Sequence, residues 1–346
     1  MLQYSIKNKL NTQEKNDIFL LLEKTNASLL QYPEWVNYTQ PGRKNIFITA
    51  YHPIKGLIAY VLVSVKMFHG IIWFGPVSSD IDFVPEFCKK SLELIKHNGL
   101  GLLSIVNSYS DEVRNKIIFK IADNYKISQK THTLNWATVA IDLNKSLDDL
   151  YLNFSENNKR SIKKQLNAGF VVRIVENGND VQALAMIYNK MYKNKKLKRQ
   201  VKNSSKMFLN IQHFFKETSK GVIMGIFNKD ILIGGVVIGY HGKTAFYHMG
   251  ASNNDIKNMP VMHLLFFEII KFLKSKGFDT LDMGGYSLDN VNNKQLININ
   301  RFKLGFGGNI ITYSKPIHIV ISLTKFNIIN YIKPLIFKGR NLFKQN

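Results

Sequence analysis

Residues 278–285 are Phe278-Asp279-Thr280-Leu281-Asp282-Met283-Gly284-Gly285, and residues 301–308 are Arg301-Phe302-Lys303-Leu304-Gly305-Phe306-Gly307-Gly308. A short apolar run that stops at Gly-Gly is typical of a buried strand ending at a cleft, because glycine lets the backbone adopt positive φ or approach a ligand closely. The polar residues between the two runs predict a loop of about fifteen residues. Loops of this length within a compact fold often have a function. We therefore predict that this stretch forms the floor and rim of a binding site.

The chain is strongly basic. Its 346 residues include 47 Lys+Arg against 24 Asp+Glu, which gives a formal net charge of +23. A field of this sign favours nucleic acid, an anionic membrane surface or phosphorylated substrates. The excess is uneven: thirteen Lys or Arg against two acids lie from Lys159 to Lys206, and six Lys or Arg with no acid lie from Asn309 to the end. The alternative interpretation is a set of solvated helix faces.

The single cysteine, Cys88, excludes an intramolecular disulfide and favours a reducing compartment. It lies in an apolar-periodic segment, so a buried core thiol is the expected role. The N-terminus has no signal-peptide pattern, and no window approaches eighteen apolar residues. The predicted location is therefore cytoplasmic. Peripheral contact with the inner face of the plasma membrane is compatible with this prediction.

The chain reads as two successive domains. Helices are expected at 13–24, 84–97 and 111–123, with strands at 45–50, 56–66, 70–76, 101–106 and 131–143. After Leu143 the order is helix, basic helix at 156–168, strand, two helices, a meander of strands, a long helix at 260–275 and a buried strand at 280–283. This order is that of a GNAT acyltransferase module. Its repetition predicts an α/β (α+β) protein with two tandem GNAT-like modules, at 1–143 and 144–311, and a basic amphipathic segment at 312–346 that returns to pack on the first.

Several runs in a fixed order resemble the FemABX-type peptidoglycan aminoacyltransferases and their BioF2-like relatives in the GNAT superfamily. The matching runs are Leu134 to Leu143, Leu150, Asn158-Lys159-Arg160-Ser161-Ile162-Lys163-Lys164, Gly169-Phe170-Val171-Val172, Ala245 to Ser252, Pro260 to Gly285 and Arg301 to Gly308. Trp35 and Gly75-Pro76 fit more loosely. Coverage is best from about residue 134 to residue 310, as far as these motifs extend.

The resemblance implies a double GNAT fold and an enzyme of cell wall biogenesis. Members of the family transfer an aminoacyl group from aminoacyl-tRNA to the side-chain amine of a peptidoglycan precursor, without a metal or other cofactor. The chemistry is ester aminolysis, whose transition state carries negative charge on the former carbonyl oxygen. Such a reaction depends on positioning and on a hydrogen-bond donor aimed at that oxygen.

The family's Arg-Phe-Lys motif corresponds to Arg301, Phe302 and Lys303 here. The resemblance implies that Phe302 and Lys303 are catalytic and that Lys303 stabilises the oxyanion. The alternative is that Lys303 neutralises a carboxylate such as Asp282 across the cleft. Arg301, Asp282, Gly284 and Gly285 are the predicted substrate-binding residues around it.

Further contacts are expected from the basic helix and from one strand. Arg160, Lys163 and Lys164 would suit the phosphates of a nucleotide- or lipid-linked precursor or of tRNA, unless they form a solvated face. Tyr247 and His248 lie on a strand that should edge the cleft, and Tyr247 is preferred as the residue that faces the site. His248 and His263 have no metal-ligand spacing with other Cys, His or acidic residues, so no metal is expected.

Two departures from the family pattern bear on the substrate. The stretch from Asp180 to Thr218 is too short for the long helical-hairpin arm of bridge-forming enzymes, and the cations expected near Trp35 are displaced to Arg43 and Lys44. They favour a second hypothesis, a CoA-dependent N-acyltransferase acting on an amino sugar or amino acid in envelope or polysaccharide synthesis. Against that hypothesis, residues 255–261 contain no glycine to cradle a pyrophosphate.

A third hypothesis is a non-catalytic RNA- or membrane-binding GNAT scaffold, although both glycine pairs and Lys303 are present. The tail from Lys325 to Arg340 mixes apolar residues with cations and is expected to contact anionic lipid. The alternative for the tail is a packed helix with a basic rim.

Overall fold

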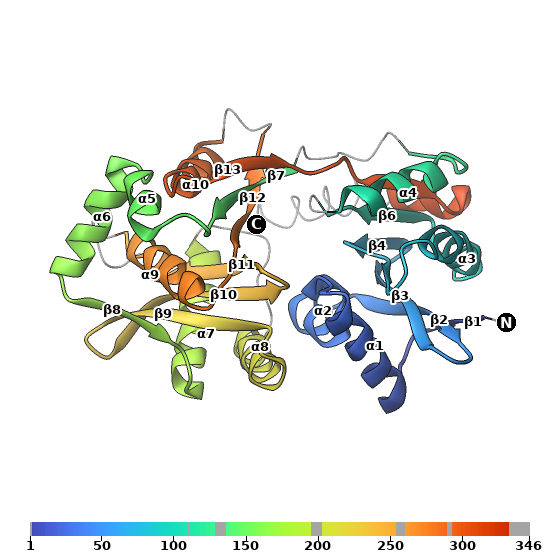
Figure 1. Ribbon diagram of the computed structural model, residues 1–346, viewed down its shortest axis with the longest axis horizontal. Coiled ribbons are helices and arrows are strands. Elements are labelled where there is room, and N and C mark those ends of the chain that lie inside the picture. Colours follow the sequence, from blue (N-terminus) through green and yellow to red (C-terminus); the bar gives the residue numbers. More distant parts are fainter. Residues whose placement is uncertain are drawn as a thin grey trace, which may run out of the picture. The chain divides into compact units, whose positions relative to one another are not determined.

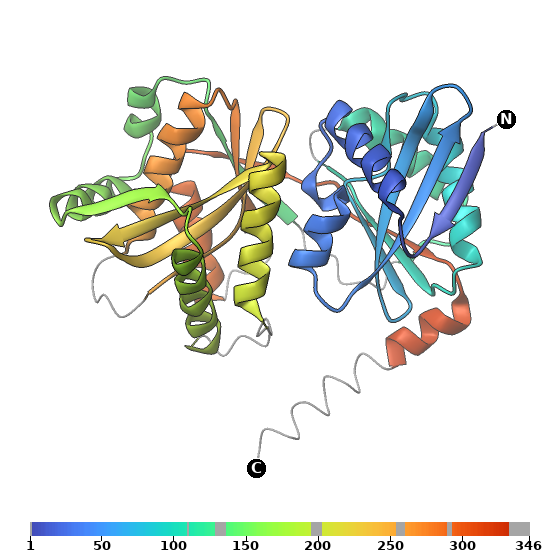
Figure 2. The ribbon, with the colours of Figure 1, turned by 90° about the horizontal axis from the view of Figure 1, so that it is seen from below.

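A computed structural model describes residues 2–108, 111–128, 136–194, 203–253, 260–288 and 293–331. The chain divides into two compact units. Unit 1 comprises Met1–Thr133 and Tyr313–Asn346, and unit 2 comprises Leu134–Thr312. Figures 1 and 2 show the elements of each unit in two views.

Unit 1 contains a seven-stranded sheet with the order β1-β2-β3-β4-β6-β14, in which β5 pairs with β3. Its elements are β1 (Gln3–Lys7), α1 (Thr12–Lys24), η1 (Leu29–Gln31), α2 (Pro33–Thr39), β2 (Lys44–His52), β3 (Gly56–Lys66), β4 (His69–Trp73), β5 (Val77–Ser78), α3 (Val84–Lys96), β6 (Leu102–Val106), α4 (Glu112–Ala122) and β14 (Ile317–Val320). Helices α3 and α4 pack on one face of this sheet through Phe87, Ile95 and Ile118. The predicted strands and helices of this region are confirmed, and β1 was not anticipated.

Unit 2 contains a second seven-stranded sheet, with the order β13-β7-β12-β11-β10-β9-β8. Its elements are β7 (Trp136–Asp142), α5 (Leu147–Leu152), α6 (Glu156–Asn167), β8 (Phe170–Ile174), α7 (Gly178–Asn194), α8 (Ser204–Thr218), β9 (Gly221–Asn228), β10 (Ile231–His241), β11 (Thr244–Ser252), α9 (Met262–Ser275), β12 (Thr280–Ser287), α10 (Lys294–Leu304) and β13 (Asn309–Thr312). The predicted mixed α/β class is confirmed.

The apolar helix α9 anchors the core of unit 2. Its Leu265, Phe266 and Ile269 are fully buried against residues of β9, β10 and β12 such as Leu281. Helices α7 and α8 lie on the opposite side of the strands, so that the sheet is covered on both faces (Figure 1). Covered faces explain why β10 is a nearly continuous apolar run in the sequence.

The first strand of unit 2 and the last strand of unit 1 pair with strands that lie far from them in the sequence. β7 lies between β12 and β13 in unit 2. β14 follows unit 2 in the sequence but pairs with β6 of unit 1, Ile317 opposite Ile105. The predicted boundary at residue 143 therefore falls too late, because β7 was assigned to the first domain although it pairs in the second sheet.

The predicted loop between the two Gly-Gly runs is replaced in large part by regular structure. β12 continues to Ser287, and α10 begins after Asn293, whose side chain accepts hydrogen bonds from the backbone N–H groups of Gln295 and Leu296. Asparagine is a weak helix former but a good N-cap. The Asn-rich composition of this stretch therefore predicted a loop. In the structure, Phe302 and Lys303 instead lie in the last turn of a helix.

The returning segment packs on unit 1 after β14. Residues 323–331 are helical, and Phe326 and Ile329 are buried with Leu102. Leu323 and Tyr331 remain exposed. The rest of the predicted basic tail, residues 332–346, lies outside the described residues. Within the described ranges, no helix combines the length and apolar character needed to cross a bilayer.

The position of β7 makes a prediction about fragments. We expect residues 134–312 to fold cooperatively on their own, and residues 144–312 to show no cooperative thermal transition. The shorter fragment loses the buried Val139 and Ile141 and leaves the adjoining backbone groups of β12 and β13 without partners. Circular dichroism melts of the two purified fragments make the comparison, and equal melting of both would contradict it.

Candidate functional site

The sheet of unit 2 opens between two parallel strands. β11 and β12 pair over Thr244–Phe246 and Thr280–Asp282, although the strands run on to Ser252 and Ser287. Past Phe246 and Asp282 the two described strands no longer pair with each other. Ligands commonly bind outside the carboxyl ends of parallel strands, and this is where both strands separate.

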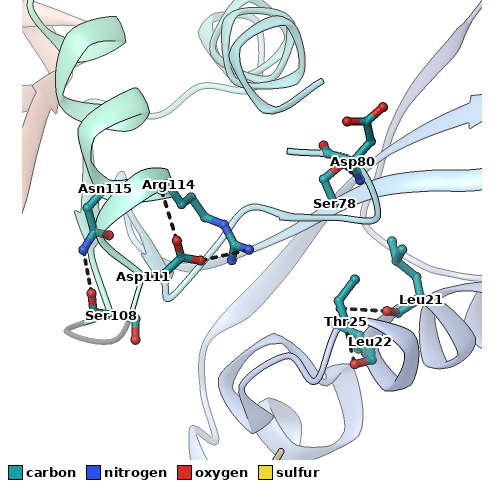
Figure 3. Close-up of polar contacts among 9 residues, drawn as sticks. All are labelled: Leu21, Leu22, Thr25, Ser78, Asp80, Ser108, Asp111, Arg114 and Asn115. Carbon is teal, nitrogen blue, oxygen red and sulfur yellow. Dashed lines mark hydrogen bonds and ion pairs between the residues drawn. The ribbon is translucent and has the colours of Figure 1, made fainter. Parts of the chain in front are cut away.

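The related strand pair of unit 1 stays closed. β4 and β6 pair from His69 opposite Leu102 to Trp73 opposite Val106, and Phe74 N continues the ladder by donating to Val106 O at 2.8 Å. The chain after β6 is tied down as well. Asn115 Nδ2 donates to Ser108 O at 2.6 Å (Figure 3). The open strand pair is therefore a property of unit 2.

A bulge in β12 shapes the floor of this opening. The pairing with β7 shifts between Asp282, opposite Ala140, and Gly285, opposite Thr138. Gly284 has φ +71° there, a conformation that favours glycine. The Asp282 carboxylate accepts hydrogen bonds from Gly284 N at 2.7 Å and from the hydroxyl of Thr138. Asp282, a predicted substrate contact, thus holds the bulge in place.

Lys303 lies against this bulge. Its side chain comes from the last turn of α10, and the residue is 7% exposed. Nζ donates to Gly284 O at 2.9 Å and to Gly285 O at 2.7 Å. Because an ammonium has three N–H groups, one donor is left for a ligand. The structure therefore brings together four predicted residues: Asp282, Gly284, Gly285 and Lys303.

Burial controls the charge of this lysine. Desolvation lowers the pKa of Lys303 to about 8, and the nearby negative charge of Asp282 partly opposes the shift. Among the described residues no direct ion pair joins the two side chains; the bonds of Lys303 go to carbonyl oxygens instead. A buried cation with a lowered pKa at the mouth of an opening is typical of a functional site.

Phe302 fixes the end of α10 that carries Lys303. Its ring makes edge contacts with His263 at 5.1 Å, Phe266 at 5.5 Å and Phe306 at 5.3 Å between centroids. These are favourable edge-to-face geometries in a water-poor environment. By packing against side chains of α9, Phe302 therefore helps to position the adjacent Lys303.

A cleft of about 1020 Å³ lies beside α10 and the end of β12. Arg301 and Phe302 line it, together with the start of α6. Among the described residues the lining contains four asparagines, two serines, one arginine and no acid. Apart from His263 and Tyr286, its polar members there are Asn157, Asn158, Asn298, Asn300, Ser155, Ser287 and Arg301. Such a lining suits a ligand that is rich in hydroxyl and amide groups.

Asn158 is the residue that the sequence prediction missed. It is 2% exposed, and its Nδ2 has no hydrogen-bond partner in the described structure. A buried donor without a partner is costly and calls for an explanation such as a bound ligand. The signal was present, since Asn158, Ile162 and Gln165 follow the inward spacing of α6.

The remaining predicted contacts are not among the residues that line the cleft. Arg160, Lys163 and Lys164 are on the exposed face of α6 and do not line the cleft. The ring of Tyr247 packs edge-on against Phe266 at 5.1 Å, and burial raises the pKa of its hydroxyl. Roles for these four side chains in substrate binding stay predictions.

Metal ligation has no support within the described ranges, where no three His, Cys, Asp or Glu side chains converge to hold an ion. His263 Nδ1 is 2.9 Å from Pro260 O, and burial lowers the pKa of this imidazole. The His263 side chain therefore contacts the backbone just before α9, while its ring packs against Phe302.

Two glycine substitutions test how tightly the cleft is built. A Cβ at Gly305 would lie 2.7 Å from Asn158 Nδ2, whereas a Cβ at Gly285 meets nothing within 4 Å. Gly305→Ala should lower the free energy of unfolding by about 1–3 kcal/mol, because Asn158 must shift in a packed interior. Urea denaturation gives the comparison, with Gly285→Ala, expected within about 0.5 kcal/mol of wild type, as the matched control. Equal stability of the two variants would show that Asn158 is not fixed as described.

Comparison with known proteins gives a family match over part of the chain. Residues 153–294 match the family model described as Acetyltransferase (GNAT) domain. A curated relative, the lipid II:glycine glycyltransferase of Staphylococcus epidermidis, is 24% identical over 110 residues. The aligned part covers 32% of this chain and 26% of the relative, so it spans about a quarter of that protein's length.

Solved structures are similar over almost the whole chain. FemX has a TM-score of 0.70 and 12% identity, with 94% of this chain and 99% of that chain covered. The C-terminal domain of a putative lysylphosphatidylglycerol synthetase from Agrobacterium fabrum has a TM-score of 0.63 and 12% identity, with coverages of 92% and 96%. At this level of identity the likenesses show a shared fold.

Proposed function

Since the chain belongs to the GNAT superfamily, is related to the FemABX-type transferases and carries two tandem GNAT-like modules, we propose that it is a Fem-like aminoacyltransferase. Unit 2 holds the active site. The reaction is transfer of an aminoacyl group from aminoacyl-tRNA to an amine of a peptidoglycan precursor. This proposal rests on the buried Lys303. Two of its N–H groups donate to the carbonyl oxygens of Gly284 and Gly285, and the third remains for a ligand.

The chemistry requires a donor for developing negative charge. The acceptor amine attacks the carbonyl carbon of the aminoacyl ester, and the electron pair of the C=O bond moves onto oxygen. The remaining N–H of Lys303 stabilises this oxyanion, and its two carbonyl contacts hold it in position without reorganisation. The tetrahedral intermediate then collapses: the ester C–O bond breaks, the tRNA ribose oxygen takes up the proton lost by the amine, and an amide is left.

The cleft beside α10 is suited to the end of the donor, although Lys303 itself is not among its lining residues. Among the described residues its lining has a single cation, Arg301, with carboxamides and hydroxyls around it. Phosphate groups are bound most strongly by several cations or by fixed backbone donors. The lining therefore favours an uncharged, hydroxyl-rich portion of the donor, such as a terminal nucleoside, over a pyrophosphate. The acceptor is proposed by analogy with the relative that is named for lipid II.

A CoA-dependent N-acyltransferase is the second candidate. It is favoured by the description of the matching family as an acetyltransferase domain and by the opening between β11 and β12. The two donors differ so much that binding of the purified protein to charged tRNA and to acyl-CoA separates the candidates. Tight binding of acyl-CoA without binding of charged tRNA would reject the aminoacyl-tRNA donor and favour the CoA-dependent N-acyltransferase.

Lys303→Met tests the catalytic role directly. We expect kcat/KM for transfer to fall by about 10²-fold or more, the scale of losing one oxyanion donor. The fold should persist, because an apolar side chain of similar length replaces a buried cation. Lys294→Met, at the exposed start of the same helix, is the control and should keep wild-type activity. If Lys303→Met transferred the aminoacyl group at the wild-type rate, Lys303 would not be the oxyanion donor.

The pKa of Lys303 predicts a pH dependence. Because burial lowers this pKa to about 8, the cation is present below pH 8 and is lost as pH rises further. We expect kcat/KM to decline above about pH 8. In Lys303→Arg the charge persists beyond about pH 12, so the residual activity should lack this decline. Identical alkaline limbs in both pH–rate profiles would assign the titration to another group.

A further inference from the structure

The exposed face of α6 is strongly basic and has no role in the cleft. Arg160, Lys163 and Lys164 are exposed on it, whereas Asn158 and Gln165 face inward. The acid on this helix, Glu156, is paired with Lys159 at 3.0 Å. Arg160, Lys163 and Lys164 place three positive charges on this exposed face.

Large exposed aliphatic side chains occur on α6 and on the elements that flank it. Leu152 at the end of α5 is 70% exposed, Leu166 on α6 is 49% exposed and Val171 on β8 is 53% exposed. Lys159 Nζ donates to Leu152 O at 3.0 Å, which ties the end of α5 to the flank of α6. Leu166 follows Lys163 by three residues, so the two are neighbours on one helix face. Exposed aliphatic and basic side chains thus occur together on these consecutive elements of unit 2.

We propose that this α5–α6 shoulder (Leu152, Arg160, Lys163, Lys164, Leu166 and Val171) docks unit 2 on an anionic lipid membrane. Aliphatic side chains bury at the acyl boundary while the lysine ammonium groups stay at the level of the lipid phosphates. Each cation near such a surface adds to binding. A surface that binds single-stranded RNA pairs cations with aromatic rings for base stacking. This shoulder presents aliphatic side chains, which favours lipid.

The same helix connects this surface to the cleft. Asn157 and Asn158, in the first turn of α6, line the cleft, and Lys163 and Lys164 lie one to two turns further along. Docking through the shoulder would hold the cleft at a fixed distance of a few helical turns from the lipid phosphates. A substrate linked to a lipid could then reach the site without leaving the membrane.

Vesicle co-sedimentation of the full chain tests the proposal. The vesicles are phosphatidylcholine alone or phosphatidylcholine with about 30 mol% phosphatidylglycerol, which gives roughly the surface charge of a cytoplasmic leaflet. Lys163→Glu/Lys164→Glu should weaken binding to the anionic vesicles at least tenfold. Leu152→Ser/Leu166→Ser should weaken it while leaving the charge unchanged. Binding to the neutral vesicles should be weak for every form.

Lys89→Glu/Lys90→Glu is the matched control, because these consecutive exposed lysines on α3 belong to unit 1. It makes the same change in net charge and should keep most of the binding. Circular dichroism melts confirm that each variant is folded. Equal losses for both lysine pairs, or no loss for Lys163→Glu/Lys164→Glu, would overturn the proposal. Loss of binding to single-stranded RNA with vesicle binding retained would assign the shoulder to RNA instead.

Discussion

The ammonium group of Lys303 is buried against two carbonyl oxygens, and the site depends on this arrangement. Taking a cation out of water is unfavourable, and the lowered pKa of Lys303 records that cost. The carbonyls of Gly284 and Gly285 can accept its hydrogen bonds because β12 bulges there. The bulge in turn needs Asp282, whose carboxylate binds Gly284 N. One charged side chain thus requires a glycine with positive φ, a buried acid and a strand that leaves its register.

The two units have a similar architecture but differ at the ends of their parallel strand pairs. In unit 1 the parallel strands stay paired to their ends, whereas in unit 2 they separate after Asp282. Unit 2 also places a large polar cleft next to the separated strands, with Arg301 and Asn158 in its walls. The same fold therefore provides a closed module and an open one, and a functional site requires the open one.

The sequence predicts local structure well where periodicity and end signals agree. The strand predicted at 280–283, which forms the first half of β12, and the basic helix with Ile162 inward were both recognised. Two features required information that local patterns do not contain. The apolar run around Ile141 predicts a strand but not the sheet in which it pairs, because pairing is non-local. The Asn-rich helix α10 was read as a loop, because its side-chain cap and its packing through Phe302 override weak propensities.

The late position of β14 in the chain has a consequence for synthesis on the ribosome. β6 is translated roughly two hundred residues before β14, the strand that covers its edge. At about 5–20 residues per second, that interval lasts on the order of tens of seconds. During this time the nascent first sheet presents an apolar edge strand, Leu102–Val106, that can template aggregation. Slow translation of unit 2 would therefore prolong the period in which unit 1 needs a chaperone.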